Sequence, residues 1–253
     1  MKTISFVRNM IYTGDLILVN RDYPYRGESS YKALMPIDSV NVKVLLARHV
    51  VSIYNNLINK LKAQNRITVV SGWRSQKEQE EIFNESLMKH GKNFTSKYVA
   101  LPGHSEHQTG LALDLALNQP DIDFLRPCFP NTGVCASFRK KADRFGFIER
   151  YPEGKEDITG IAYEPWHFRY VGFPHSIIMK QTGDTLEEYH ARIRQYLYGR
   201  SFLKYDFGSF RTEISYLPAD KEVVRFLMDE DTPYTVSGNN MDGFVITVWR
   251  AGR

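Results

Sequence analysis

The sequence predicts a mixed α+β fold, and three observations lead to that class. Segments whose apolar residues follow a helical period lie between short segments whose apolar residues recur at every second position. Glycines stop several of these segments, as at Gly72 and Gly146. Beyond Gly183, one helix-like segment precedes three strand-like segments. We therefore expect a main domain over residues 1–183 and a small α+β appendage over residues 184–253.

The composition is that of a folded, soluble protein. Charged residues make up 25% and hydrophobic residues 42% of the 253 positions, ordinary values for a globular chain that can bury a substantial core. The net charge of +4 is a mild excess spread along the chain, so we expect no nucleic-acid partner. The N-terminal segment holds no apolar run longer than Leu16 to Val19. We therefore expect neither a signal peptide nor a membrane span.

Cysteine usage points to the same compartment as the expected absence of a signal peptide. The chain has two cysteines, Cys128 and Cys135, which are too few for a disulfide framework. We expect reduced thiols in a cytoplasmic protein. A disulfide that closes the short loop between them is the alternative.

The first long element is an amphipathic helix within residues 42–63. Apolar side chains recur there at helical spacing, at Leu46, Val50, Ile53, Tyr54, Leu57, Ile58 and Leu61. The apolar run 67–70 that follows is typical of a buried strand, and Ser71-Gly72 ends it.

A second helix begins after Ser75. Ser75 and Glu78 have the spacing of a capping box, in which each side chain bonds the backbone N–H of the other residue. We expect the helix over residues 76–90 and a loop over residues 91–103. Arg74 therefore lies at the junction between a strand and a helix.

The segment LALDLAL, residues 111–117, has the clearest strand pattern. Leucine occupies every second position, which predicts a β-strand with one face in the core. The opposite face carries Asp114 between two alanines, so a group that requires a negative charge must approach it closely. His107 precedes this strand, and the break at Thr109-Gly110 can turn the chain beside Asp114. A histidine and a carboxylate of this kind predict two ligands of a zinc ion.

The segment EPWHFRY, residues 164–170, supplies a third ligand. Its aromatic residues alternate with His167 and Arg169, which predicts a strand with His167 facing away from an aromatic core. Three protein ligands with water in the fourth position are typical of a catalytic zinc site.

Two further side chains complete a hydrolytic site. Glu164 stands three residues before His167, near enough to take a proton from a zinc-bound water and hand it to a leaving amine. Arg74 is suited to stabilise the developing oxyanion. Each residue alone has a commoner structural use, such as a satisfied histidine, an exposed edge aspartate or an arginine paired with a surface acid. Together they predict metal-assisted amide hydrolysis.

The remaining elements follow from shorter patterns. A basic helix is expected within residues 136–147 and ends at Gly146. In the appendage, Thr185 and Glu188 cap a helix that is expected to run to about Tyr198. Strand-like segments then follow at residues 212–218, 233–237 and 244–250, around the turn 238–243.

Three motifs, SGWRS (71–75), SEHQTGLALD (105–114) and EPWHFRYVG (164–172), together resemble those of the D-alanyl-D-alanine zinc peptidases of the vancomycin-resistance group. The likeness extends from about Val69 to Gly172. It is nearest to the bifunctional VanXY enzymes, which combine D,D-dipeptidase and D,D-carboxypeptidase activity in the cytoplasm. The family is similar to lysostaphin-like peptidases and the hedgehog domain. Pattern and resemblance together imply a small antiparallel sheet that presents the zinc ligands, with helices packed behind it.

The resemblance also implies a role for individual residues. It gives the zinc ligands as His107, Asp114 and His167, the catalytic base as Glu164 and the carbonyl stabiliser as Arg74. It further implies that Ser105 and Gln79 contact substrate, although a turn serine and a solvated helix glutamine are equally ordinary readings. His104 matches no fixed family position, and we expect it to lie behind the ligands or in solvent. The implied substrates are the D-Ala-D-Ala dipeptide and the UDP-muramyl pentapeptide.

Two alternatives use the same residues differently. A phage-lysin endopeptidase would cut an L-Ala–D-Glu bond with the same metal site, but it would usually carry an export or wall-binding segment, and we find none. A zinc-stabilised binding module without catalysis would be expected to lack Glu164 or Arg74, and both are present. Fold alone does not choose among these functions. The oligomeric state is not predicted.

Overall fold

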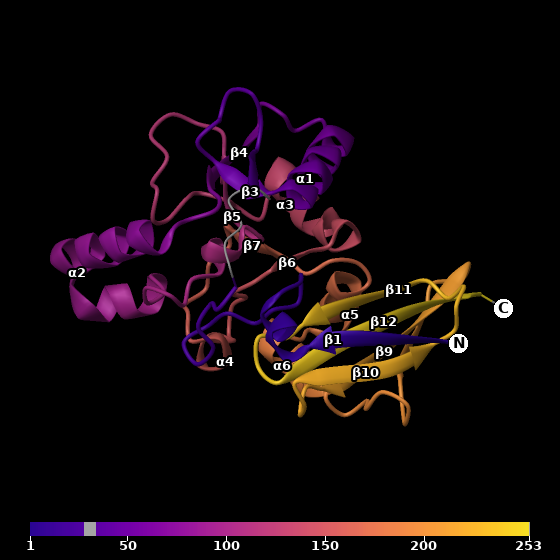
Figure 1. Cartoon of the computed structure of the whole chain (residues 1–253). Helices are drawn as coiled ribbons and strands as arrows, with labels where there is room; N and C mark the ends of the chain where they lie inside the picture. Colours follow the sequence, from indigo (N-terminus) through magenta and orange to yellow (C-terminus); the bar gives the residue numbers. More distant parts are fainter. Residues whose placement is uncertain (28–33, 253) are drawn as a thin grey trace. The chain divides into compact units, whose positions relative to one another are not determined.

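The computed structural model describes residues 1–27 and 34–252, which form two compact units. The larger unit is Val19–Thr185, and the smaller unit combines Met1–Leu18 with Leu186–Arg253. The first residues of the chain therefore pack with the C-terminal segment rather than with the main domain expected over residues 1–183. The reason is strand pairing, because the N-terminal strand joins a strand of the smaller unit (Figure 1).

A four-stranded antiparallel sheet lies at the centre of the larger unit. Its strands follow the order β4-β5-β7-β6, and their bounds are β4 Ile67–Ser71, β5 Ala112–Leu117, β6 Phe147–Glu149 and β7 His167–Tyr170. The register pairs Asp114 of β5 with His167 of β7. The predicted small antiparallel sheet is confirmed, and the predicted strands at 67–70 and 111–117 are β4 and β5.

Two helices share a hydrophobic core with this sheet. They are α1 (Arg48–Leu61) and α3 (Gly133–Ala142). The core includes the leucine face of β5, residues of both helices and the aromatic residues of β7; its buried members include Leu57, Ile58, Leu111, Leu113, Leu115, Phe138, Trp166, Phe168 and Tyr170. The helix expected within residues 42–63 begins only at Arg48, because β3 (Leu45–Ala47) pairs with β2 (Leu34–Pro36) just before it.

The helix α2 (Gln76–Tyr98) begins at the predicted capping box. The Ser75 hydroxyl accepts from the backbone N–H of Glu78, and the Glu78 carboxylate accepts from the backbone N–H of Ser75. These bonds satisfy two donors that a helix start leaves without partners. Arg74 consequently lies between the end of β4 and the start of α2, as predicted.

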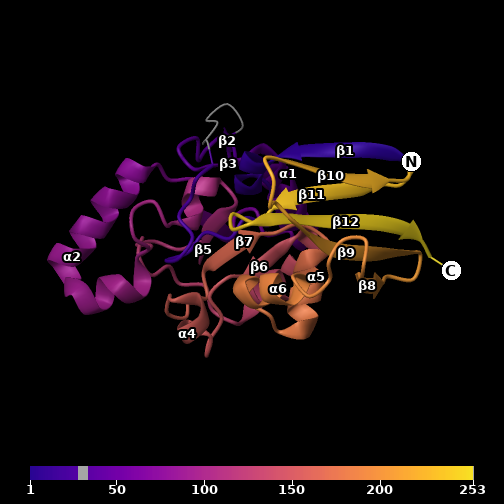
Figure 2. The ribbon, with the colours of Figure 1, turned by 60° about the horizontal axis from the view of Figure 1, so that its bottom comes forward.

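The prediction of a loop over residues 91–103 is wrong for its first part. Gly91 has a φ of +76° and interrupts α2, but the chain returns to a helix and continues to Tyr98. The two arms fold back on each other (Figure 2), with the hydroxyls of Ser86 and Thr95 2.8 Å apart between them. A glycine in the left-handed region reverses the chain here without ending the helical segment.

The predicted basic helix is confirmed as α3, but the α-helix ends at Ala142 rather than at Gly146. After α3, the turn η4 (Asp143–Phe145) tightens the chain, and Gly146 closes it with a φ of +82°. The other short helical elements of the larger unit are η3 Glu106–Thr109, α4 Glu156–Thr159 and α5 His175–Thr182.

The smaller unit is rich in strands. One sheet pairs β1 (Lys2–Val7) with β10 (Val223–Met228), and the other has the order β11-β12-β9-β8. The bounds of its other elements are η1 Arg8–Tyr12, α6 Leu186–Ile193, β8 Leu203–Asp206, β9 Phe210–Pro218, β11 Tyr234–Gly238 and β12 Gly243–Ala251. The three strands predicted for the appendage are confirmed as β9, β11 and β12.

The helix expected to reach Tyr198 ends earlier, at Ile193. Tyr196 and Tyr198 exchange backbone hydrogen bonds with Tyr216 of β9, so the chain forms a bridge to β9 at Leu197 instead of continuing the helix. Among the described residues, no helix combines the length and the apolar character that a bilayer crossing requires.

Candidate active site

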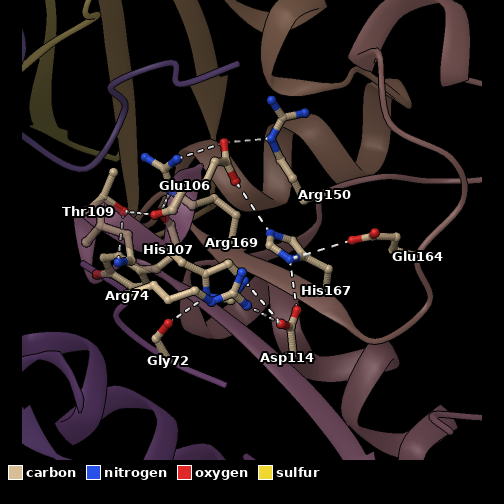
Figure 3. A network of polar contacts seen from close by, with 12 residues as sticks. Gly72, Arg74, Glu106, His107, Thr109, Asp114, Arg150, Glu164, His167 and Arg169 are labelled. Carbon is tan, nitrogen blue, oxygen red and sulfur yellow. Dashed lines mark hydrogen bonds and ion pairs between the residues drawn. The ribbon is translucent and has the colours of Figure 1, made fainter. Parts of the chain in front are cut away.

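The predicted site residues come together in the larger unit (Figure 3). His107 lies on the short turn η3, Asp114 in the middle of β5 and His167 at the start of β7. Glu164 stands in the turn before β7, and Arg74 in the junction between β4 and α2. These five residues line one cavity, together with Ser105 and Gln79.

Strand alternation explains why Asp114 and His167 meet. The leucines of β5 point into the hydrophobic core, so Asp114 must project from the other face of the sheet. His167 is its direct partner on β7 and faces away from the aromatic core, as predicted. Gly110, with a φ of +72°, ends η3 and lets the chain turn from the element that carries His107 into β5.

The three candidate ligands lie close enough together to hold a metal ion. Nε2 of His107 lies 3.1 Å from Oδ2 of Asp114, and Nδ1 of His167 lies 2.9 Å from Oδ1 of the same carboxylate. All three ligand atoms lie within 4.8 Å of one another, and all three residues are buried. Zinc binds histidine nitrogen and carboxylate oxygen at about 2.0–2.2 Å. Small outward shifts of these side chains would make room for such an ion, so the residues fit the metal.

A backbone hydrogen bond fixes which nitrogen of His107 is available. Its Nδ1 lies 2.6 Å from the carbonyl oxygen of Gly72. Because a carbonyl can only accept, Nδ1 carries the proton, which leaves Nε2, the nitrogen on the Asp114 side, as the one that can bind a metal. A metal-binding histidine is commonly held by such a bond from its other nitrogen.

Burial and mutual contact shift the pKa values of the whole cluster. Burial lowers the pKa of His107, and the charge of Arg74 lowers it further. Burial would raise the pKa of Asp114, but the two histidines outweigh it and hold that pKa well below its usual range. Burial also opposes the charged form of His167, yet the hydrogen bond to Asp114 raises the pKa of His167 to about 9.

Glu164 is buried at the edge of the ligand cluster. Its Oε2 lies 3.8 Å from Nδ1 of His167, and its backbone N–H donates to the carbonyl oxygen of Tyr151. Burial raises the pKa of Glu164 to about 8, and the nearby charge of Asp114 contributes in the same direction. A carboxyl group whose pKa lies near neutrality can both accept and donate a proton.

Arg74 is held over the ligands by three side chains. Its Nη1 donates to Oε1 of Gln79 at 2.9 Å, and its Nη2 donates to Oγ of Ser71 at 2.9 Å and to Oδ2 of Asp114 at 3.4 Å. Its backbone N–H donates to the carbonyl oxygen of His107 at 3.2 Å. The guanidinium group is therefore held in a fixed place beside Asp114.

The residues expected to contact substrate differ in their surroundings. Gln79 is fully buried, and besides accepting from Arg74 it donates to the carbonyl oxygen of Ala100 at 2.8 Å. Both ends of its amide are thus engaged, the oxygen with Arg74 and the nitrogen with the backbone of Ala100. Ser105 is buried and lines the cavity two residues before His107. His104 bonds the backbone oxygen of Asn20 through Nδ1 and does not line this cavity.

The sequence analysis missed a buried ionic group behind the ligands. Glu106 pairs with Arg150 at 2.8 Å and with Arg169 at 2.9 Å, and all three side chains are fully enclosed. The available signals were the acid between Ser105 and His107 and the position of Arg169 on the same strand face as His167. Neither signal shows that Glu106 and Arg169 meet, because the two residues are far apart in the sequence.

Comparison with known proteins gives a consistent result. Residues 43–173 match the family model VanY, D-alanyl-D-alanine carboxypeptidase. The bifunctional D-Ala-D-Ala dipeptidase and D-Ala-D-Ala carboxypeptidase VanXYC of Enterococcus gallinarum is 40% identical to this chain over 181 residues, which cover 71% of this chain and 95% of the relative. The family expected from the motifs is therefore the one that matches.

Two solved structures extend the likeness to the fold. One is the structure of the vancomycin-resistance D,D-dipeptidase VanXYg in complex with a D-Ala-D-Ala phosphinate analogue. It has a TM-score of 0.95 at 48% identity, and the match covers 98% of this chain and 99% of the VanXYg chain. The other is the structure of a VanY variant from a VanB-type resistance cassette in complex with Zn(II). It has a TM-score of 0.58 at 32% identity, and the match covers 70% of this chain and 98% of the VanY chain. The predicted α+β peptidase fold is confirmed.

Proposed function

This chain belongs to the VanY family of D-alanyl-D-alanine carboxypeptidases, and we propose that it is a zinc peptidase acting on D-Ala-D-Ala. The proposed reactions are hydrolysis of the free dipeptide and removal of the terminal D-Ala from the UDP-muramyl pentapeptide. One observation carries the proposal above all: His107, Asp114 and His167 converge within 4.8 Å with Glu164 beside them. The relatives named above provide the substrate class.

We propose that His107, Asp114 and His167 hold the zinc ion. Two buried histidine nitrogens and one carboxylate are the donor set of many catalytic zinc sites. When bound, zinc polarises the substrate carbonyl and lowers the pKa of a bound water to about 7. The remaining chemistry is assigned to side chains of this chain.

Glu164 is the proposed general base and acid. Its carboxylate accepts the proton of the attacking water and then donates it to the nitrogen of the departing D-alanine. The low exposure of Glu164 and its distance of 3.8 Å from the His167 ring support this role. Its pKa of about 8 applies to the cluster without a cation, and a positive charge nearby would lower that pKa so that the base is available at neutral pH.

Arg74 is the proposed stabiliser of the carbonyl oxygen. Its hydrogen bonds to Gln79 and Ser71 hold the guanidinium group in place before the reaction, so little reorganisation is needed as negative charge develops. Ser105 is proposed to bind the terminal carboxylate of the substrate. For Gln79 we propose a contact with substrate only in addition to its bond with Arg74.

The proposed substrate choice rests on the relatives. A site built for D-residues rejects L-residues by collision, and a collision discriminates more strongly than the about 1–3 kcal/mol of a missing methylene. We propose that D-Ala-D-Ala is destroyed both as a dipeptide and as the end of the cytoplasmic wall precursor. This removes the terminus that vancomycin binds and confers resistance, while termini altered to D-lactate or D-serine are spared.

A substrate panel tests the proposal. D-Ala-D-Ala, D-Ala-D-Ser, L-Ala-L-Ala, the pentapeptide precursor and an L-Ala–D-Glu peptide are offered separately to the zinc-loaded protein, and product release is quantified. We expect release of D-Ala from D-Ala-D-Ala and from the precursor, and little from the others. Equal cleavage of L-Ala-L-Ala would indicate a general peptidase. Cleavage of the L-Ala–D-Glu bond alone would favour the endopeptidase alternative.

A further inference from the structure

The Glu106 carboxylate lies at full burial directly behind one of the proposed ligands. It comes from η3, immediately before His107, while its partner Arg150 directly follows β6 and its partner Arg169 lies on β7. Nε of Arg150 and Nη1 of Arg169 both donate to the same oxygen, Oε1, at 2.8 and 2.9 Å. A buried carboxylate that two guanidinium groups hold on one oxygen has a fixed orientation.

The second oxygen of this carboxylate is aimed at a ligand ring. Oε2 of Glu106 and Nε2 of His167 lie 3.7 Å apart, and neither atom has a hydrogen-bond partner within the part of the chain that the structure describes. Figure 3 shows Glu106 between the two guanidinium groups on one side and the His167 ring on the other. The separation is somewhat longer than a hydrogen bond, so an inward shift of less than 1 Å would close it.

The other nitrogen of the His167 ring faces the ligand cluster. Nδ1 lies 2.9 Å from Asp114 and 3.8 Å from Glu164. A neutral imidazole that gives its Nδ1 lone pair to a metal carries its proton on Nε2. That Nε2–H is buried and requires an acceptor, because an unsatisfied buried donor costs about 1–3 kcal/mol. Oε2 of Glu106 is the group in position to accept it.

We propose that Glu106 is the positioning residue for His167: its Oε2 accepts the Nε2–H of the ring and so directs Nδ1 toward the zinc ion. The inference rests on the proposed function, because it assigns a task within that zinc site. Arg150 and Arg169 take part in the same arrangement by holding the carboxylate of Glu106. Since they occupy Oε1, the carboxylate is kept as a hydrogen-bond acceptor and does not swing toward the metal as a competing ligand.

The chain offers a matched control for this arrangement. Glu149 of β6 is also a carboxylate paired with an arginine, since it accepts from Nε of Arg139 at 2.9 Å. It lies in the same unit and does not line the cavity of the ligands. Glu149→Gln therefore disturbs an arginine–carboxylate pair of the same unit without touching His167.

Zinc affinity, measured by competition with a chelator of known affinity, tests the proposal. Glu106→Gln is expected to weaken zinc binding about 10- to 100-fold, the usual cost of losing a group that orients a metal ligand. Glu106→Asp, which keeps the charge but draws it back from the ring, is expected to weaken it as well. Glu149→Gln is expected to weaken zinc binding less than about tenfold. Unchanged affinity in a folded Glu106→Gln protein would overturn the proposal.

A second measurement needs no variant at Glu106, which protects the test against a failure of that variant to fold. The ¹⁵N resonances of His167 in the zinc-loaded protein, assigned by their loss in His167→Gln, report the tautomer. We expect a protonated Nε2 and a metal-bound Nδ1. A metal-bound Nε2 would contradict the proposal. Neither readout requires peptidase activity, so a protein that binds zinc in this way but spares D-Ala-D-Ala would refute only the proposed substrate.

Discussion

Replacement of Glu164 by Gln separates metal binding from chemistry. The Glu164 side chain is 7% exposed and lies 3.8 Å from Nδ1 of the His167 ring, and Gln has the same shape, so the three ligands should keep their places. Burial already raises the pKa of Glu164 to about 8, so the fold accommodates an uncharged group at this position. We therefore expect zinc content and thermal stability close to those of the unmodified protein.

Turnover is expected to respond very differently. A general base contributes about 10²- to 10⁴-fold to the rate, which corresponds to about 3–5 kcal/mol of activation free energy. The assay is release of D-Ala from D-Ala-D-Ala at saturating substrate, with zinc content measured on the same samples. Glu153→Gln, at an exposed carboxylate in the neighbouring loop, is the control and should leave the rate unchanged. A Glu164→Gln enzyme with near-normal turnover would refute the assignment of the base.

Four other substitutions test the remaining groups. His107→Ala or His167→Ala should abolish both zinc binding and D-Ala release, and full zinc occupancy in metal analysis of either variant would exclude that ligand. Arg74→Ala should reduce kcat about 100-fold, because one oxyanion donor contributes about 3 kcal/mol; a kinetic comparison in which only KM rises would contradict this role. Burial opposes the charged form of Glu106, but Arg150 and Arg169 outweigh it and hold the pKa of Glu106 well below its ordinary value of 4.5. The ionised Glu106 carboxylate therefore stabilises the fold above pH 4.5, and this stabilisation is lost as the pH falls further. When the zinc-free protein is unfolded in urea between pH 6 and 3, Glu106→Gln should lose less unfolding free energy than the unmodified protein. Equal losses would contradict this prediction.

Local patterns were sufficient to predict much of the catalytic unit. Alternation in LALDLAL gave both the strand β5 and the face on which Asp114 lies, because a side-chain period of two admits no other assignment once one face is leucine. The same reasoning placed His167 opposite the aromatic core. The capping box at Ser75 fixed the start of α2, and hence the place of Arg74. In each case the deciding interaction lies within a few residues.

The features that escaped prediction depend on partners far apart in the sequence. Lys2 pairs with Met228 across almost the whole chain, and no local pattern of the first residues indicates a partner there. The contact of Glu106 with Arg150 depends in the same way on how β6 and η3 meet. The second arm of α2 was missed for a different reason, because Gly91 was taken to end the helix when it only reverses the chain.

The most direct test of the central claim is the metal dependence of D-Ala release from D-Ala-D-Ala. The purified protein is stripped with a chelator, dialysed, and titrated with zinc while D-Ala is quantified. We predict negligible hydrolysis without metal and recovery that saturates at one zinc ion per chain, as the ligand set of His107, Asp114 and His167 requires. Full activity of the stripped protein, or no D-Ala release from the zinc-loaded protein, would contradict it.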